Sequence, residues 1–374
     1  MKEELRVIIS GGGTGGHIFP AISIANAIKA QHPDAQILFV GAEGRMEMKR
    51  VPAAGYDIKA LPICGFDRKN LLKNISVLFK IFKSQKMAKK IIKDFRPMVA
   101  VGVGGYASGP TLNVAESLGI PTLLQEQNSY AGVTNKLLAR KASKICVAYE
   151  NMDRFFPKEK IIQTGNPIRQ DLTDNDLTKE QVCERFKMQP DKPTILIIGG
   201  SLGAQTLNRS VMTKLNEIAK SDIQIIWQCG GYYFNQILEE LTQKGQPNNL
   251  FVTDFISNMK EAYAAADLVV SRAGAGSISE LCCLGKPVIL VPSPNVAEDH
   301  QTKNALALVD KEAALYIKDS DAERRLIPLA IETVQNKEKL KNLSKNIKTM
   351  AYPDAAKTIA EEVYKLAVAY NNKD

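Results

Sequence analysis

Short apolar runs that end in glycine or polar residues recur along the chain, and stretches with helical spacing separate them. In the first half these runs are 5–10, 36–40, 98–102, 121–125 and 144–148. Their length and their Val and Ile content are typical of buried strands. Because strands that alternate with helices form parallel sheets, the first half is predicted to be a doubly wound α/β domain.

The same pattern starts again in the second half. Residues 165–193 are rich in Asn, Asp, Pro and Lys and are predicted to be a connector. Further strands are predicted at 194–200, 223–231, 267–274 and 286–292. The sequence therefore predicts two Rossmann-like halves in tandem, followed by a final helix over about 354–371.

The composition agrees with two globular domains. The chain has 374 residues, of which 45% are apolar and 24% are charged. The start of the chain, MKEELRVIIS, does not resemble a signal peptide, and no apolar run approaches the roughly 20 residues that span a bilayer. We expect the protein to be made in the cytosol and to stay there.

Six cysteines form no C-x-x-C pair, so neither a zinc site nor a disulfide framework is indicated.

The positive charge is concentrated in one segment. Residues 68–96 hold ten Lys and Arg residues and one acid, Asp94, an excess that equals the net charge of +9 of the whole chain. At about 100° per residue, one helical face of this segment is apolar throughout and is predicted to pack on the core. A second stripe begins apolar and becomes basic, which favours a helix that lies on an anionic bilayer. The predicted core face is Val77, Ile81, Ala88, Ile92 and Phe95, and the second stripe is Leu71, Ile75, Leu78, Phe79 and Phe82 followed by Lys86, Lys89 and Lys93.

Two alternatives remain for this basic segment. A helix buried on both sides, with its lysines in solvent, is the first of them. Nucleic-acid binding is less favoured, because no aromatic residues alternate with the basic ones.

A glycine-rich turn, Gly11 to Gly16, joins the first predicted strand to the first predicted helix, and His17 follows it. Its G-x-G-x-x-G pattern is typical of a turn that holds phosphate at a helix N-terminus, so a dinucleotide-dependent oxidoreductase is one alternative. A second such turn, Gly199 to Ala204, lies half a chain away. Since a dehydrogenase needs only one such half, the repeat favours two halves that face each other.

Nucleotide binding is predicted for the second half. The segment Gly274 to Glu280 follows a predicted strand and opens a helix. Amides at Gly276 and Ser277 would suit a diphosphate at that helix N-terminus. Glu280 would then accept two hydrogen bonds from a ribose diol. The alternative for Glu280 is an acid in the first helical turn that complements the helix dipole.

Six motifs together resemble the MurG family of N-acetylglucosaminyltransferases. They are GGTGGHIFPA, GVGGYASGP (102–110), LLQEQNSYAGVTNK (123–136), TGNPIR (164–169), GGSLGAQTLN (199–208) and SRAGAGSISE (271–280). The resemblance implies the GT-B fold, an α/β architecture in which two Rossmann-like parallel-sheet domains face each other across a cleft. It implies domains at 1–168 and 169–352, with a C-terminal helix, 353–374, that packs back on the first domain.

The resemblance also implies an activity. The enzyme would transfer GlcNAc from UDP-GlcNAc, with inversion, to the C4 hydroxyl of MurNAc in lipid I, giving lipid II and UDP in peptidoglycan synthesis. Such an enzyme acts in cell-wall biogenesis and therefore in cell shape and cell division. Its expected place is peripheral, on the cytoplasmic face of the plasma (inner) membrane.

Site residues follow from the resemblance in the same way. The first domain would bind the acceptor diphosphate with Gly13, Gly104, Gly105 and Tyr106. The donor would contact Thr14, Gly15, Gly16, Asn128 and Arg169 of the first domain. In the second domain the implied donor contacts are Ser201, Ile256, Ala275, Gly276, Ser277, Ile278, Ser279, Glu280 and Gln301.

The reaction needs a base for the acceptor hydroxyl and stabilisation of the departing diphosphate. His17 is the first choice for the base because histidine titrates near neutral pH, and Glu126 is its rival. The alternative for His17 is a residue that caps or orients the start of the helix. Arg169 and the helix N-terminus at 276–277 would stabilise UDP, and a surface cation is the alternative for Arg169.

No cofactor is expected to be required for the chemistry. Two D-x-D strings, Asp174 with Asp176 and Asp319 with Asp321, match a pattern that holds divalent ions in other glycosyltransferases. The first lies in the predicted connector, and the second is typical of a helix cap with an acidic first turn. A divalent ion that assists the reaction is therefore not expected to be bound by the protein.

Other functions remain as alternatives. They are another GT-B enzyme on UDP-sugars, such as a glycolipid synthase or UDP-GlcNAc 2-epimerase, and a non-catalytic module that binds nucleotide sugars. The expected partners are UDP-GlcNAc, lipid I, the anionic membrane surface and other proteins of cell-wall synthesis, and nucleic acid is not among them.

Overall fold

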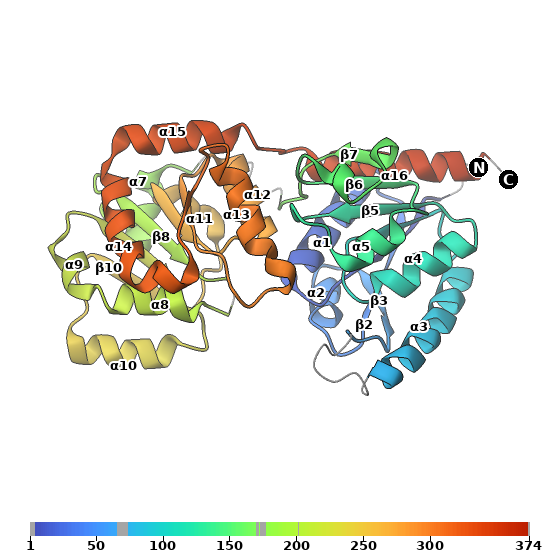
Figure 1. Cartoon of the computed structure of the whole chain (residues 1–374), viewed down its shortest axis with the longest axis horizontal. Coiled ribbons are helices and arrows are strands. Elements are labelled where there is room, and N and C mark those ends of the chain that lie inside the picture. The colour runs from blue at the N-terminus through green and yellow to red at the C-terminus, as the bar shows by residue number, and fades with distance from the viewer. Residues whose placement is uncertain (1–3, 66–73, 170–171, 173–176, 201, 373–374) are drawn as a thin grey trace. The chain divides into compact units, whose positions relative to one another are not determined.

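A computed structural model describes residues 4–65, 74–169, 172, 177–200 and 202–372, without the side chains of residues 74–76, 78 and 297. The chain forms two compact units, one of residues 1–169 and 352–374 and one of residues 170–351. Each unit contains one parallel sheet flanked by helices (Figure 1). The predicted pair of parallel α/β domains is therefore confirmed.

The sheet of the first unit has seven strands in the order β3-β2-β1-β4-β5-β6-β7. Each neighbouring pair is parallel. Because β1 is followed in sequence by β2 on one side and lies beside β4 on the other, the winding direction reverses between β1 and β4. The strands are β1 Arg6–Ser10, β2 Gln36–Ala42, β3 Asp57–Leu61, β4 Val99–Gly102, β5 Thr122–Glu126, β6 Lys144–Val147 and β7 Ile161–Gln163.

Helices cover both faces of this sheet. Buried side chains of α1 and α16 pack on one face, and those of α3 and α4 pack on the other. The C-terminal helix α16 thus completes the core of the first unit, to which it contributes Ile359 and Val363, both fully buried. The helices are α1 Gly15–Gln31, α2 Glu47–Ala53, α3 Asn74–Phe95, α4 Ser108–Ser117, α5 Val133–Leu138 and α16 Ala355–Asn371, with short 3-10 turns η2 Met152–Arg154 and η3 Lys158–Lys160.

The sheet of the second unit has six strands in the order β10-β9-β8-β11-β12-β13, so its winding direction reverses between β8 and β11. Its core includes Trp227 on β9, whose indole donates to the Asn208 side chain at 3.1 Å. The strands are β8 Thr194–Ile198, β9 Gln224–Gln228, β10 Leu250–Thr253, β11 Leu268–Ser271, β12 Val288–Leu290 and β13 Leu315–Tyr316. The helices are α7 Lys179–Val182, α8 Gln205–Met212, α9 Leu215–Lys220, α10 Phe234–Lys244, α11 Met259–Ala265, α12 Ala275–Leu284, α13 His300–Val309, α14 Asp319–Gln335 and α15 Lys337–Lys348, with 3-10 turns η4 Cys183–Phe186 and η5 Ala297–Asp299.

Four strands were not predicted, and all four are edge strands of their sheets. They are β3, β7, β10 and β13. An edge strand is covered less completely, so its sequence need not be continuously apolar. Along β3 the exposed Asp57 and Lys59 alternate with less exposed neighbours. The predicted strands that ran on into glycines end earlier, since residues 199–200 and 229–231 lie beyond β8 and β9.

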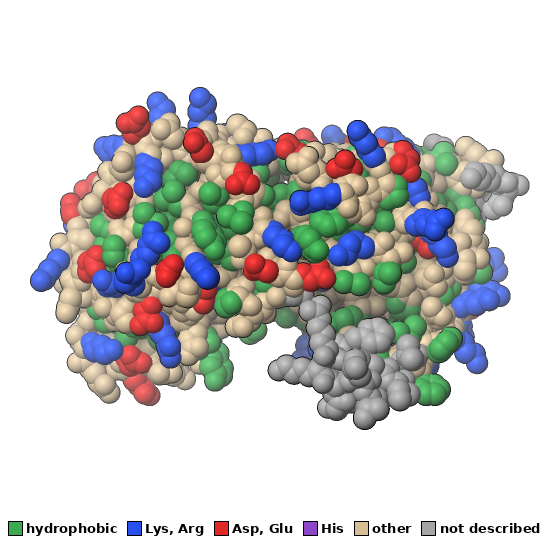
Figure 2. Space-filling model, viewed as in Figure 1, with side chains coloured by type: hydrophobic (Ala, Val, Ile, Leu, Met, Phe, Trp, Pro, Cys, Tyr) green, Lys and Arg blue, Asp and Glu red, His purple; other side chains and the backbone are tan. Residues whose placement is uncertain are grey.

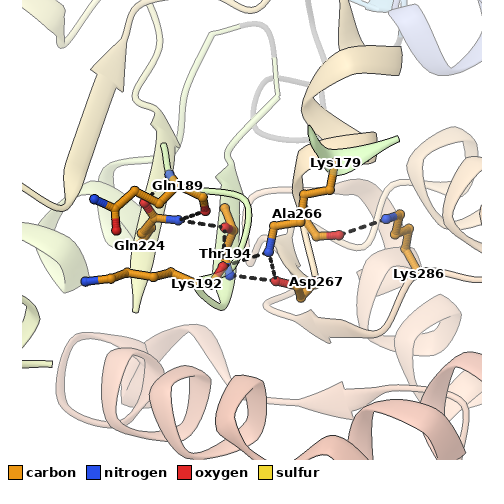
Figure 3. Close-up of polar contacts among 8 residues, drawn as sticks. All are labelled: Lys179, Gln189, Lys192, Thr194, Gln224, Ala266, Asp267 and Lys286. Atoms are coloured by element: carbon orange, nitrogen blue, oxygen red, sulfur yellow. Dashed lines mark hydrogen bonds and ion pairs between the residues drawn. The ribbon is translucent and has the colours of Figure 1, made fainter. Parts of the chain in front are cut away.

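The prediction that residues 165–193 form only a connector is wrong in its second half. This stretch contains α7 and η4, whose Val182, Cys183 and Phe186 are buried. Lys179 Nζ lies 2.6 Å from the Asp267 carboxylate and donates to the Lys192 carbonyl at 2.7 Å (Figure 3). Apolar burial and these polar contacts make the segment part of the second unit.

The Asp267 carboxylate joins this segment to the sheet, since it also accepts the Thr194 N–H at 2.8 Å (Figure 3). Replacing Asp267 with Ala leaves that N–H without its acceptor and removes the ion pair of the Lys179 ammonium, which keeps the Lys192 carbonyl. We expect the free energy of unfolding of the second unit to fall by about 2 kcal/mol. Urea unfolding followed by fluorescence of Trp227, the one tryptophan of the chain, measures this unit.

Asp222 provides the control for this prediction. Its carboxylate lies 3.0 Å from Lys192 Nζ, but the side chain is 82% exposed, compared with 34% for Asp267. The Asp222→Ala change should therefore alter the free energy of unfolding by less than about 1 kcal/mol. Equal losses in the two variants would contradict the structural role given to Asp267.

Four of the six cysteines are buried, and Cys64 and Cys283 are partly exposed. Burial raises the pKa of the Cys146 and Cys282 thiols to about 12. These thiols stay protonated at neutral pH and act as small apolar side chains rather than as nucleophiles.

Candidate functional site

In a doubly wound sheet, ligands bind at the carboxyl ends of the two neighbouring strands between which the winding direction reverses. The loops that follow these two strands form the site. In the first unit these strands are β1 and β4. The turn Gly11 to Thr14 follows β1 and leads into α1, and the segment Val103 to Tyr106 follows β4. The sheet topology therefore brings together two of the motifs that the sequence analysis singled out.

These two turns pack backbone against backbone. A Cβ atom at Gly105 would lie 2.4 Å from the Gly12 carbonyl oxygen, and one at Gly11 would lie 2.1 Å from Val103 Cγ2. Gly105 also has φ +86°, a conformation that residues with a side chain rarely adopt. Larger residues would separate the two turns.

His17 lies in the first turn of α1 and contacts both glycine segments. Its Nδ1 is 3.0 Å from the Gly12 carbonyl oxygen, and a Cβ at Gly104 would lie 3.0 Å from Nε2. Because a carbonyl oxygen only accepts, Nδ1 carries the hydrogen in this contact, and Nε2 is the basic nitrogen of the neutral ring. The same contact also orients the helix start, so both interpretations of His17 have a geometric basis.

Glu126, the rival base, ends β5 and is 1% exposed. One carboxylate oxygen accepts the backbone N–H of Asn128 at 3.1 Å and its side-chain amide at 3.4 Å. The other accepts the Gly132 N–H at 3.0 Å and the Asn135 amide at 2.9 Å. With four donors around it, this carboxylate holds the loop between β5 and α5 in place and is poorly arranged to take a proton from a substrate.

Glu47 was not predicted as a site residue. It opens α2, is 1% exposed, and accepts the Gly13 N–H at 2.9 Å and the Ala42 N–H at 3.0 Å. An acid at the start of a short helix is ordinarily a solvated residue that complements the helix dipole, so its sequence gave no signal for burial. The Gly13 amide, predicted to contact the acceptor diphosphate, is thus already paired with an internal carboxylate.

Other predicted residues of the first unit lie in segments that follow the carboxyl ends of its strands. Thr14 is the exposed N-cap of α1, and Gly15 and Gly16 are its first two residues. Tyr106 is 49% exposed, and its ring covers Gly65, where a Cβ would lie 2.4 Å from the phenol. Arg169 is half-buried at the end of the unit, which does not support a freely solvated cation.

In the second unit the neighbouring strands between which the winding reverses are β8 and β11. The turn after β8 packs on the turn after β9, because a Cβ at Gly203 would lie 2.1 Å from the Cys229 carbonyl oxygen. Gln228 donates to the carbonyl groups of Gly200 and Asp254, both at 3.1 Å, and so connects the turns after β8 and β10. Ile256, which follows that second turn, has a buried side chain. Ser201 lies outside the described residues.

The helix α12 begins at Ala275, after the short loop that follows β11. Around Gly276 there is open space, since no atom would lie within 4 Å of an added Cβ. Ile278 does not suit the predicted donor contact, because its side chain is 2% exposed and its N–H donates to the Gly274 carbonyl at 3.0 Å. The Ser279 hydroxyl donates to the Ala275 carbonyl at 2.9 Å.

Glu280 and Gln301 are half-buried in the second unit and are held by defined contacts. Tyr263 donates its hydroxyl to Glu280 at 3.1 Å. Glu280 lies beyond the first turn of α12, so the alternative of a first-turn acid is wrong. The Gln301 side-chain carbonyl accepts the Ser293 N–H at 2.8 Å, which fixes the loop after β12 to α13.

Of the two D-x-D strings, the one that the structure describes lies in the first turn of α14, which contains Asp319 and Asp321. Asp319 forms an ion pair with Arg272 and accepts the Thr206 hydroxyl at 2.9 Å. It is the first residue of α14, whose N-cap is Lys318 rather than an aspartate. Asp174 and Asp176 lie outside the described residues. Among the described residues, no three His, Cys, Asp or Glu side chains are grouped as metal ligands.

The basic helix α3 has the predicted core face. Val77, Ala88 and Ile92 are buried, and Ile81 and Phe95 are packed against the core. On the second stripe Phe79 is 74% and Phe82 is 71% exposed, so a helix buried on both sides is ruled out. Leu71 lies outside the described residues, as do the side chains of Ile75 and Leu78.

Beyond these phenylalanines the stripe continues with the exposed side chains of Lys86, Lys89 and Lys93. Figure 2 shows apolar and basic side chains next to one another over α3. Over the described part of the chain, no helix combines the length and the apolar character that a membrane crossing requires.

Comparison with known proteins agrees with this geometry. The Glycosyltransferase family 28 N-terminal domain matches residues 7–147, and the Glycosyltransferase family 28 C-terminal domain matches residues 194–359. A protein of Phocaeicola vulgatus is 66% identical over 374 residues, the full length of both chains. Its name is UDP-N-acetylglucosamine--N-acetylmuramyl-(pentapeptide) pyrophosphoryl-undecaprenol N-acetylglucosamine transferase. A Porphyromonas gingivalis protein of the same name is 55% identical and covers 97% of this chain and 96% of its own.

Solved structures support the same assignment. MurG of Acinetobacter baumannii has a TM-score of 0.79 and 31% identity, and the match covers 96% of this chain and 99% of that one. UDP-GlcNAc 2-epimerase of Neisseria meningitidis has a TM-score of 0.65 over 97% of this chain and 100% of that one, but its identity of 14% indicates a shared fold alone. With both domain models matched and relatives of high identity along the whole chain, this protein belongs to glycosyltransferase family 28 and, within it, to the MurG family of N-acetylglucosamine transferases.

Proposed function

We propose that this enzyme transfers GlcNAc from UDP-GlcNAc to the C4 hydroxyl of MurNAc in lipid I, with inversion at C1, to give lipid II and UDP. The names of relatives that are 55–66% identical along the whole chain support this reaction. One observation carries the proposal. In each unit, family motifs follow the two neighbouring strands between which the winding reverses, which are β1 and β4 in the first unit and β8 and β11 in the second.

His17 is the proposed base. Its Nδ1 contact with the Gly12 carbonyl makes Nε2 the basic nitrogen, and a hydroxyl near Gly104 would lie within reach of Nε2. Glu126 is proposed to have a supporting role, because its four hydrogen bonds fix the loop that carries Asn128.

The nucleotide of the donor is proposed to bind the second unit. The N-terminus of α12 at Ala275, Gly276 and Ser277 offers backbone N–H groups and a positive dipole end to the diphosphate. Glu280 is proposed to accept the ribose hydroxyls, and Gln301 to contact the sugar. The remaining proposed donor contacts are the backbone at Ile256, Ser201 and Ser279, and in the first unit Thr14, Gly15, Gly16, Asn128 and Arg169.

The acceptor diphosphate is proposed to bind the first unit. The turn Gly104 to Tyr106 provides candidate amide donors, and an added Cβ at Gly104 would lie 3.0 Å from His17 Nε2. Gly13 is left out of this set, because its N–H is already donated to Glu47.

The chemistry is proposed to need no metal ion held by the protein. The helix dipole of α12 and Arg169 would offset the charge of the leaving diphosphate. Asp319, one aspartate of the described D-x-D string, is engaged by Arg272 and Thr206. A divalent ion that assists would accompany the diphosphate itself.

Product analysis with UDP-GlcNAc and a soluble lipid I analogue tests this function. UDP release that requires the acceptor, together with a disaccharide product, is the expected result, and excess EDTA should leave it largely unchanged. UDP release without acceptor, or conversion of UDP-GlcNAc to another UDP-sugar, would contradict the proposed transfer.

The exposed stripe of α3 is proposed to place the enzyme at an anionic membrane surface, on the cytoplasmic face where a lipid-linked acceptor is reached. Phe79 and Phe82 provide an apolar wedge, and Lys86, Lys89 and Lys93 provide attraction to anionic headgroups. Other cell-wall synthesis proteins are proposed as further partners at the membrane.

Replacing Phe79 and Phe82 with Ser should lower partitioning onto anionic liposomes by about 10²–10⁴-fold, because each buried phenylalanine contributes about 1.5–3 kcal/mol. Co-sedimentation measures this loss. Transfer to the soluble acceptor analogue should be unchanged, since neither side chain contributes to the core.

Leu202 and Tyr232, which are 76% and 85% exposed in the second unit, provide the matched control. Changing both to Ser removes comparable exposed apolar surface away from α3 and should leave liposome binding intact. Equal loss in the two double variants would overturn the assignment of the membrane surface to α3.

A further inference from the structure

Glu47 occupies an unusual place for a carboxylate. It is 1% exposed, and its two oxygens accept the backbone N–H groups of Gly13 at 2.9 Å and Ala42 at 3.0 Å. A Cβ at Gly12 would lie 2.3 Å from the carboxylate, so these atoms pack directly against the Gly12 backbone. A buried carboxylate without partners is costly, and here backbone donors satisfy both oxygens.

The same glycine connects this carboxylate to the proposed base. Gly12 packs against Glu47 through its Cα, and its carbonyl oxygen lies 3.0 Å from His17 Nδ1. Gly12 and Gly13 have φ of +146° and +89°, so the turn contains two successive residues in conformations that favour glycine. A chain with this freedom needs an anchor if it is to present one carbonyl to the imidazole in a fixed direction.

The carboxylate accepts a backbone amide of the glycine turn, as a bound phosphate does in other glycine-rich turns. In a dinucleotide-binding fold, the amides of such a turn and the following helix N-terminus hold a phosphate. Here the Gly13 amide is donated to an internal carboxylate instead. A second anion at that amide would meet the negative charge of Glu47, which accounts for a G-x-G-x-x-G turn that is not a dinucleotide site.

We propose that Glu47 is a positioning residue for catalysis: its carboxylate replaces a bound phosphate in the glycine turn and thereby fixes the Gly12 carbonyl that selects the tautomer of His17. This inference rests on the proposed function of His17 as the base. Glu47 itself touches no substrate and acts through Gly12 and Gly13.

The test compares Glu47→Gln and Glu47→Asp with the wild-type enzyme. Gln presents an NH₂ group to one of the two N–H donors, and Asp keeps the charge but is one C–C bond too short to reach both. Because a displacement of about 1 Å can cost about 10²-fold in rate, kcat should fall by up to about 10²-fold in both variants. The KM for UDP-GlcNAc should change less than kcat, since the nucleotide of the donor is proposed to bind the second unit.

Glu43→Gln is the matched control, because Glu43 lies four residues away on the same connection and is exposed. It should retain wild-type kcat. Circular dichroism and thermal unfolding show whether each variant is folded at the assay temperature.

Nitrogen-15 NMR of the imidazole rings gives a readout that a purely structural role would not change. The chain has three histidines, at 17, 32 and 300, and His17→Asn identifies the His17 signals. Wild-type His17 should be mainly the Nδ1–H tautomer, and Glu47→Gln should shift it toward a mixture of tautomers. His32 and His300 should keep their signals.

Lower thermal stability with unchanged kcat and an unchanged His17 tautomer would overturn the proposal, and so would wild-type kcat in both Glu47 variants. Failure of the proposed function has a different signature. In that case His17→Asn would retain activity, while the NMR comparison of Glu47 variants would still report whether the turn controls the imidazole.

Discussion

The His17→Asn variant is expected to fold normally and to lose about 10²–10⁴-fold in kcat, the range that a general base contributes. Asn places its amide nitrogen near the position of Nδ1, so it can still donate to the Gly12 carbonyl. It has no equivalent of the basic Nε2. The variant therefore separates proton transfer from orientation of the turn, which His17→Ala would not do.

Steady-state kinetics with UDP-GlcNAc and a soluble acceptor analogue, measured from pH 5.5 to 9, provides the test. The acidic limb of the wild-type kcat profile should disappear in the variant. His32→Asn is the control, since His32 lies at the other end of α1 and stacks on Tyr364 with ring centroids 4.2 Å apart. Near-wild-type kcat in His17→Asn would reduce His17 to an orienting residue.

The Glu280→Ala variant is expected to raise the KM for UDP-GlcNAc by about 10²-fold or more with a smaller effect on kcat. A carboxylate that accepts two ribose hydroxyls makes two charge-assisted hydrogen bonds, each worth about 1.5–3 kcal/mol. Those bonds are equally present in the bound substrate and the transition state, so their loss appears mainly as weaker binding.

A 2′-deoxyribose analogue of UDP-GlcNAc makes this test specific. The analogue should bind the wild-type enzyme more weakly than UDP-GlcNAc, whereas Glu280→Ala should hardly distinguish the two, as in a double-mutant cycle. Tyr263→Phe removes the hydroxyl 3.1 Å from Glu280 but keeps the carboxylate, and it should change KM much less. Equal discrimination by wild type and Glu280→Ala would show that Glu280 does not contact the ribose.

The four unpredicted edge strands show where sequence patterns reach their limit. A central strand such as β8 is covered on both faces and therefore appears as a continuous apolar run, and its five residues are all buried. The edge strand β3 has Asp57 and Lys59 in exposed positions, so no such run exists. Whether such a segment pairs with β2 depends on the sheet that is already formed.

Glu126 and Glu47 illustrate a second limit, which concerns the site. Glu126 belongs to a family motif, so sequence placed it near the reaction, but only its four donors indicate a supporting role. Glu47 belongs to none of the six motifs, and its contact with Gly13 joins residues 34 positions apart. Composition and spacing cannot report a contact of that kind.

By itself the sequence determined the central strands, the glycine turns, the two-domain α/β class and the amphipathic face of α3. Each of these is a local property, since burial of a strand, the conformational freedom of glycine and the periodicity of a helix depend on residues near in the chain. Only the tertiary structure decided the edge strands, the incorporation of α7 into the second unit, and the pairing of Glu47 with Gly13 and of Arg272 with Asp319. Those features join residues far apart in sequence, and their partners become defined when the sheets assemble.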